Sequence, residues 1–224
     1  MNTTPTPALL FDLDGTMLDT DHIHRAIFAD MMRPYGLDIT EQFYIDHVHG
    51  RLNVDFFAEF LPDLEDPEGM SNAKEAAFRE RLPRPYPAMP GVVDLVRRAE
   101  REGWGLAVVT NAMRPNAEAM LGAIGVRDAF EVMIIGEECA QGKPHPEPYL
   151  TALEQLGVSA DRAIAFEDSP SGILAAVASG AFTVGIRSAL SDADIRDLGA
   201  QDSLADFNDP KLQSILAHVL KDDR

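Results

Sequence analysis

The stretch that decides the fold is Leu9-Leu10-Phe11-Asp12-Leu13-Asp14-Gly15-Thr16, an apolar run that stops at two aspartates. The run is too continuously apolar for a half-exposed strand and is typical of a buried parallel strand. In open α/β sheets, ligands bind beyond the carboxyl ends of the strands, and both aspartates fall there. Because side chains alternate along a strand, the two aspartates lie on the same side. Carboxylates this close repel unless a cation binds or one is protonated, so the stretch predicts a hard metal ion, Mg²⁺. The alternative is an ordinary polar boundary between strand and loop.

Composition narrows the possible partners and location. The 224 residues are 46% hydrophobic, enough to bury a sizeable core, and carry a formal net charge of -18. That charge argues against nucleic acid or an anionic membrane as partner, because both bind basic surfaces. Cys139 is the only cysteine, and the first eight residues do not resemble a signal or transit peptide, so we expect a cytoplasmic protein. We also expect no membrane-spanning segment and a monomer or weak dimer.

The order of the predicted elements indicates an α/β core with an insertion. Residues 18–85 have helical patterns and no strand-like run, and the proline-rich residues 83–91 follow them. After that, strands and helices alternate, as a doubly wound parallel sheet requires. We therefore predict a Rossmann-like core domain formed by residues 1–17 and 86–224. An α-helical cap domain of residues 18–85, far longer than an ordinary loop, is inserted beside the aspartates and would act as a lid.

Three further polar positions fall at or soon after predicted strand ends. They are Thr110, Lys143 and the pair Glu167-Asp168. A carboxylate can attack phosphorus as a nucleophile, a metal and a lysine can neutralise the phosphoryl oxygens, and a hydroxyl can donate to them. Taken singly, each has a plain structural explanation: a strand-end threonine, a loop lysine and a helix N-terminus. Their joint order favours phosphoryl-transfer chemistry.

These motifs resemble the haloacid dehalogenase-like superfamily of phosphohydrolases, over Leu9 to about Ile186. The matching motifs in chain order are Asp12-Leu13-Asp14-Gly15-Thr16, Thr110-Asn111, Lys143 and Glu167-Asp168. Residues 166–173 and 179–181 look most like the branch that contains β-phosphoglucomutase and small sugar phosphatases. The dehalogenases that name the superfamily lack the second aspartate, so Asp14 argues for phosphoryl transfer over cleavage of a carbon–halogen bond.

The resemblance implies a role for each core residue. Asp12 would be the nucleophile and Asp14 the acid/base. Mg²⁺ would be held by Asp12, the backbone carbonyl of Asp14 and Asp168, with Glu167 binding directly or through water. The residues implied to bind the phosphoryl group are Thr110, Asn111 and Lys143.

In the insert, the resemblance is looser and implies three substrate-contacting residues. His24 resembles a hinge histidine of the mutase branch, Gly50-Arg51 its phosphate-contacting loop, and Lys74 a cap lysine followed by an aromatic residue, here Phe78. Arg51 and Lys74 are equally compatible with ordinary solvated helix positions.

The sequence therefore predicts an Mg²⁺-dependent phosphatase for a small phosphorylated metabolite, with a sugar phosphate as the expected class and an aspartyl phosphate as the intermediate. The enzyme alternative is a phosphomutase of the β-phosphoglucomutase type, which returns the phosphoryl group to a sugar hydroxyl. The alternative from another class is a receiver-like signalling module. Such modules also use aspartate, threonine and lysine at strand ends, but they are shorter and lack a large cap.

Overall fold

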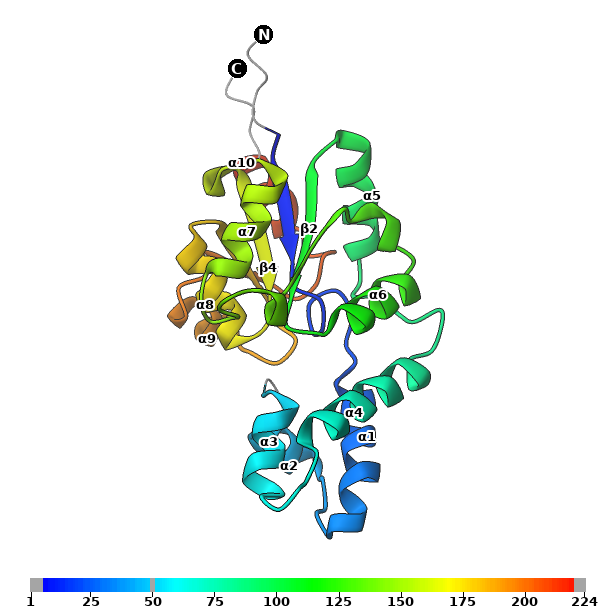
Figure 1. Ribbon diagram of the computed structural model, residues 1–224. Coiled ribbons are helices and arrows are strands. Elements are labelled where there is room, and N and C mark those ends of the chain that lie inside the picture. Colours follow the sequence, from blue (N-terminus) through cyan, green and yellow to red (C-terminus); the bar gives the residue numbers. More distant parts are fainter. Residues whose placement is uncertain (1–5, 49–50, 220–224) are drawn as a thin grey trace. The chain divides into compact units, whose positions relative to one another are not determined.

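The computed structural model describes residues 6–48 and 51–219 (Figure 1). The chain divides into two compact units, one of Met1–Asp19 with Arg84–Arg224 and one of Thr20–Pro83. The second unit starts at residue 20 and ends at 83, against 18 and 85 for the predicted insert. Its action as a cap remains a prediction, and each unit is described by itself below.

The larger unit is built on a parallel sheet of six strands in the order β3-β2-β1-β4-β5-β6. The strands are β1 (Ala8–Phe11), β2 (Gly105–Thr110), β3 (Val132–Ile135), β4 (Ala163–Glu167), β5 (Phe182–Ile186) and β6 (Asp202–Leu204). β1 is central, with Phe11 opposite Val108 of β2 and Phe166 of β4. The strand order reverses beside β1, and such a switch point is where doubly wound sheets bind ligands. The predicted fold class is confirmed.

Helices cover both faces of this sheet (Figure 1). They are α5 (Val92–Glu102), α6 (Arg114–Ala123), α7 (Glu147–Leu156), α8 (Pro170–Ser179), α9 (Asp192–Asp197) and α10 (Lys211–Val219). Leu10 lies in a buried cluster with Tyr149 of α7 and Ala176 of α8. The next side chain, Phe11, points to the other face and stacks on Phe166 with ring centroids 5.1 Å apart. Both faces of β1 are therefore buried, which explains its continuous apolar sequence.

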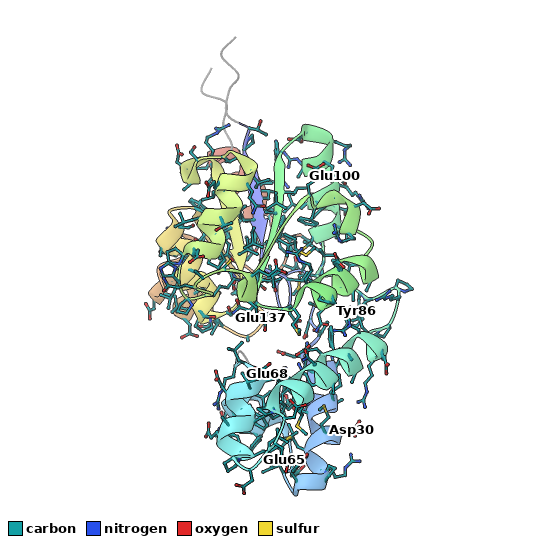
Figure 2. The ribbon with its side chains drawn as sticks, in the orientation of Figure 1. Asp30, Glu65, Glu68, Tyr86, Glu100 and Glu137 are labelled. Carbon is teal, nitrogen blue, oxygen red and sulfur yellow. The ribbon has the colours of Figure 1, made fainter. Side chains whose placement is uncertain are left out.

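Helices are the regular secondary structure of the smaller unit, and its described residues contain no strand. Its helices are α1 (Asp21–Met32), α2 (Glu41–His47), α3 (Asn53–Phe60) and α4 (Pro67–Arg81). Its core contains Phe28, Phe56 and Phe57, all fully or almost fully buried. Asp30 of α1, labelled in Figure 2, forms an ion pair with Arg81 at the end of α4 at 2.8 Å. No helix among residues 6–48 and 51–219 is long and apolar enough to cross a membrane.

Hydrogen bonds join the two chain segments that lead to the helical unit. The hydroxyl of Tyr86, labelled in Figure 2, donates to the backbone carbonyl of Asp19 at 2.5 Å. The backbone N–H of Met89 donates to the carbonyl of Met17 at 2.8 Å. These residues belong to the larger unit, so it fixes both ends of the insertion.

Candidate active site

The loop after β1 turns sharply at Gly15. Asp12 follows β1 directly, and its backbone N–H donates to the carbonyl of Phe166 on β4 at 2.9 Å. Asp14 is half-buried two positions later. Gly15 has a φ of +84°, and a Cβ added there would overlap the carboxylate of Asp168. Glycine is therefore needed for its left-handed backbone conformation and for the close approach of Asp168.

Lys143 reaches the site from the loop that precedes α7. Its Nζ donates to Oδ1 of Asp12 at 2.7 Å, to Oε1 of Glu167 at 2.6 Å and to the carbonyl of Val109 at 2.8 Å. Burial alone would lower the pKa of Lys143, but the carboxylates of Asp12 and Glu167 outweigh it and raise that pKa above its ordinary value. The site therefore holds a permanent positive charge beside Asp12, suited to binding phosphoryl oxygens.

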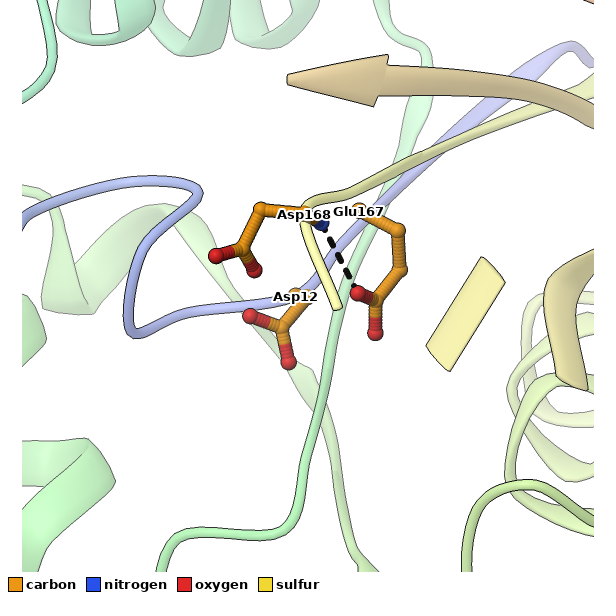
Figure 3. A group of neighbouring side chains, drawn as sticks. All are labelled: Asp12, Glu167 and Asp168. Carbon is orange, nitrogen blue, oxygen red and sulfur yellow. Dashed lines mark hydrogen bonds between the residues drawn. The ribbon is translucent and has the colours of Figure 1, made fainter. Parts of the chain in front are cut away.

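Glu167 at the end of β4 is fully buried and is the centre of the polar network. Its Oε2 accepts from the backbone N–H groups of Asp168 at 2.9 Å and Ser169 at 3.0 Å, and from the Ser169 hydroxyl at 3.0 Å. The Asp168 bond is dashed in Figure 3. These donors lie immediately before the first residue of α8, and the N-terminus of a helix favours negative charge. Oε1 accepts from Lys143 and, at 3.3 Å, from the hydroxyl of Tyr149.

Two hydroxyls hold the carboxylate of Asp168. Thr16 donates to its Oδ1 at 3.2 Å and Ser188 to its Oδ2 at 2.8 Å. Burial, with the nearby charges of Glu167 and Asp14, raises the pKa of Asp168 to about 7, although the two hydroxyls act in the opposite direction. The ionised form of Asp168 is therefore costly unless a cation lies beside it.

The acidic side chains of this edge fit a divalent metal ion. Oxygen atoms of Asp12, Glu167 and Asp168 all lie within 4.8 Å of one another, and all three residues are buried (Figure 3). Burial raises the pKa of Asp12, and the charges of Glu167 and Asp168 add to this, against the opposing effect of Lys143. One ammonium against three carboxylates leaves negative charge that a cation would neutralise, and an all-oxygen donor set suits a hard ion. Each oxygen of Glu167 accepts from at least two protein donors, whereas each oxygen of Asp168 accepts from one hydroxyl, which favours Asp12 and Asp168 over Glu167 as direct ligands. Among the described residues, the side chain of Asp14 does not belong to this group.

Thr110 and Asn111 follow β2 at the same edge. Thr110 is 3% exposed, and its Oγ1 accepts from the backbone N–H of Ala112 at 3.1 Å. The hydroxyl is thereby oriented and can still donate its own hydrogen to a bound anion. Asn111 is exposed, and its Oδ1 lies where a Cβ on Gly136 would be. The binding of phosphate by these two residues remains a prediction.

The three predicted cap residues lie in the helical unit and have protein partners there. Nζ of Lys74 is 2.7 Å from Nδ1 of His24 and 2.8 Å from Oε1 of Glu75, and Lys74 is only 4% exposed. The ring of His24 stacks on Phe78. Arg51 forms an ion pair with a glutamate of α3 at 2.9 Å. Their contact with substrate remains a prediction, and Gly50, the neighbour of Arg51, lies outside the described residues.

Ser188 and Tyr149 were not among the predicted site residues. Ser188 falls two positions after β5, so the strand-end rule used for the other positions would have found it. Tyr149 looks like an apolar-face residue of α7, and nothing in its sequence neighbourhood indicates that its hydroxyl meets Glu167.

Gly172, in the first turn of α8, leaves room for the carboxylate of Glu167. An added Cβ would overlap both carboxylate oxygens. We expect Gly172→Ala to displace Glu167 from Lys143, to lower kcat/KM for para-nitrophenyl phosphate by at least roughly tenfold, and to lower the melting temperature. Both quantities are measured on the purified variant.

The matched control is Gly122→Ala in α6, where an added Cβ meets nothing within 4 Å. Alanine there should stabilise the helix by about 0.5–1 kcal/mol and leave activity unchanged. If Gly172→Ala behaved like this control, the inferred close packing of the Glu167 carboxylate against α8 would be wrong.

Comparisons with known proteins agree with this geometry. A family model of haloacid dehalogenase-like hydrolases matches residues 9–186. The validoxylamine A 7'-phosphate phosphatase of Streptomyces hygroscopicus subsp. limoneus is 32% identical over 193 residues, with 83% of this chain and 90% of that protein covered. The fructose-1-phosphate phosphatase YqaB of Escherichia coli (strain K12) is 31% identical over 187 residues, with 80% and 95% covered. CbbY from Rhodobacter sphaeroides, crystallised with phosphate, superposes with a TM-score of 0.77 at 30% identity, covering 90% of this chain and 95% of that one.

Proposed function

The chain belongs to the haloacid dehalogenase-like hydrolases, and from this premise we propose that it is an Mg²⁺-dependent phosphoric monoester hydrolase acting on a small phosphorylated metabolite. The observation that carries the proposal is the buried contact of Lys143 with Asp12, beside the carboxylates of Glu167 and Asp168. Both relatives are named as phosphatases of a small phosphorylated compound, validoxylamine A 7'-phosphate and fructose-1-phosphate, and the second name supports a sugar phosphate as the substrate class. A cytoplasmic monomer or weak dimer remains the expected form.

The proposed chemistry uses the two aspartates in turn. The carboxylate of Asp12 attacks phosphorus, the bond from phosphorus to the ester oxygen breaks, and Asp14 gives its proton to the leaving oxygen. Asp14 then takes a proton from water, which attacks the phosphorus of the aspartyl phosphate. Inorganic phosphate leaves, and the Asp12 carboxylate is regenerated. The ammonium of Lys143 and the hydroxyl of Thr110 bind phosphoryl oxygens in both steps.

Asp12 and Asp168 would hold the metal, with the backbone carbonyl of Asp14 as a further ligand. When bound, Mg²⁺ would neutralise the negative charge that develops on the phosphoryl oxygens. The protein contributes the placement of the ligands: Thr16 and Ser188 orient Asp168, and Lys143 orients Asp12.

Loss of the Lys143 charge should impair catalysis strongly. We expect Lys143→Ala to cost about 2–4 kcal/mol of transition-state stabilisation, which is a fall in kcat/KM of about 30- to 1000-fold. Thr110→Val removes one neutral donor and should cost less. Steady-state kinetics with para-nitrophenyl phosphate measure both effects.

Lys211→Ala is the control for the removal of a lysine, because the Lys211 side chain is 51% exposed in α10. It should leave kcat/KM unchanged. An unchanged kcat/KM in folded Lys143→Ala would instead identify Lys143 as a structural lysine and overturn its proposed role.

The function is tested with a panel of phosphorylated metabolites, with Mg²⁺ present. Released phosphate and isomerised sugar are both measured, since the first product indicates a phosphatase and the second a mutase. We expect phosphate release from sugar phosphates and turnover of para-nitrophenyl phosphate. A stable phosphoprotein without turnover would indicate a receiver-like module, and no reaction with any phosphate ester would overturn the proposal.

A further inference from the structure

Tyr149 is a fully buried tyrosine that takes no part in the chemistry proposed above. Its hydroxyl donates to Oε1 of Glu167 at 3.3 Å. The face of its ring lies below the ammonium of Lys143, with Nζ 5.4 Å from the ring centroid. One side chain of α7 therefore contacts both members of the ion pair that adjoins Asp12.

We propose that Tyr149 is a positioning residue: its hydroxyl fixes Glu167, and through Glu167 the ammonium of Lys143, in the geometry needed at the phosphoryl group. The inference rests on the proposed phosphoryl-transfer function. It does not make Tyr149 a catalytic residue, because Glu167 and Lys143 separate its hydroxyl from Asp12.

The contacts form an unbroken buried chain to the proposed nucleophile. The Tyr149 hydroxyl bonds Glu167, Glu167 bonds Lys143 at 2.6 Å, and Lys143 bonds Asp12 at 2.7 Å. The side chain of Lys143 is 2% exposed and that of Glu167 is 0% exposed. Water therefore has little access to replace a lost donor, and buried polar networks depend on each member.

Packing does not explain the hydroxyl. The cluster around the ring consists of small and aliphatic side chains, among them Leu10, Ala107, Ala152 and Ala165. Phenylalanine would fill the same space, and a buried hydroxyl stabilises a protein only through the bond it makes. The placement of Glu167 is therefore the contribution that distinguishes tyrosine from phenylalanine at this position.

The Tyr149 hydroxyl restrains the Oε1 side of the Glu167 carboxylate. The start of α8 holds Oε2, and the carboxylate lies in the space that a side chain at Gly172 would occupy. Oε1 has two donors, Lys143 and Tyr149. Without the hydroxyl, Lys143 would be the one donor to Oε1 left among residues 6–48 and 51–219, and the pair would be able to shift together relative to Asp12.

The test compares Tyr149→Phe with the wild type, using para-nitrophenyl phosphate and Mg²⁺. We expect kcat to fall by roughly five- to tenfold with KM changed by less than about twofold, since the hydroxyl acts on geometry at the reacting group. Inorganic phosphate should likewise bind with an affinity changed by less than about twofold, which calorimetry measures independently of turnover.

The control is Tyr44→Phe in the helical unit. Tyr44 is also buried, and its hydroxyl donates to a carboxylate oxygen of Asp21 at 3.0 Å. It should keep wild-type kinetics and lose about as much thermal stability as Tyr149→Phe. A Tyr149→Phe variant that fails to fold while Tyr44→Phe folds would overturn the inference, because the hydroxyl would then serve stability.

A double-mutant cycle with Lys143→Ala identifies the path of the effect. If Tyr149 acts through Lys143, Tyr149→Phe should cause no further loss of turnover in the Lys143→Ala background. Equal losses in both backgrounds, or wild-type kinetics in Tyr149→Phe, would overturn the inference and leave the proposed function standing. Absence of turnover in the wild type would overturn the proposed function itself.

Discussion

Asp12→Asn is expected to abolish turnover while the protein stays folded. The amide has nearly the same shape as the carboxylate, but it is a far weaker nucleophile and a poor ligand for a hard cation. Its oxygen can still accept from Lys143, as Oδ1 of Asp12 does at 2.7 Å. Phosphate release and a thermal melt measure the two halves of this prediction.

The stability of Asp12→Asn follows from the pKa of Asp12. Burial raises that pKa well above its ordinary value of 3.8, so at neutral pH the ionised carboxylate destabilises the metal-free fold. Removing the charge should therefore leave the melting temperature of the metal-free protein unchanged or higher. A folded variant that retains a large fraction of wild-type activity would contradict the assignment of Asp12 as nucleophile.

Two other aspartates of the same loop complete the comparison. Asp14→Asn should be severely impaired but should still form some phosphoenzyme with a good leaving group, since Asp12 remains. Asp19→Asn is the control, because Asp19 is exposed and contributes its backbone carbonyl, not its carboxylate, to the bond with Tyr86. It should behave like the wild type.

The core of the fold and the edge that carries the site were predictable from short-range patterns. Continuous apolar runs marked the buried strands, and their alternation with helical patterns required a parallel sheet. Carboxyl ends of parallel strands meet at one edge, so Asp12, Thr110 and Glu167 were expected there, and the structure places them there. β6 and α9 were not predicted. Both are short and contain aspartates, so neither has a distinctive hydrophobic period.

The partners within the site could not be predicted, because they depend on side-chain contacts between distant elements. Glu167 was predicted as a metal ligand, direct or through water, yet in the structure it chiefly holds Lys143 and the start of α8. Lys74 shows the same limit. The charge and helical spacing of Lys74 fitted a solvent-exposed residue and a substrate-contacting residue equally well. In the structure, α4 packs against α1 and buries Lys74 between His24 and Glu75. Sequence spacing specifies which face a residue occupies, but not which side chain it meets.

Removal of the metal should abolish activity, and Mg²⁺ should restore it. The buried oxygen atoms of Asp12, Glu167 and Asp168 motivate this prediction. Calcium should bind but support turnover poorly, since it favours looser coordination with more ligands. The measurement is phosphate release after treatment with excess chelator and after re-addition of each metal. Full activity in excess chelator would contradict the metal requirement.

Metal and protons should compete for Asp168, which gives a test independent of activity. The pKa of Asp168 is about 7 in the metal-free fold against an ordinary value of 3.8, so the folded protein binds a proton that the unfolded chain does not. The melting temperature of the metal-free protein should therefore rise as the pH is lowered from about 8 to about 6. Mg²⁺ requires the ionised carboxylate, so its addition should raise the melting temperature more at the higher pH than at the lower.

Asp168→Asn should weaken both the pH effect and the Mg²⁺ effect. A stabilisation by Mg²⁺ that is the same at both pH values and survives in Asp168→Asn would place the metal elsewhere.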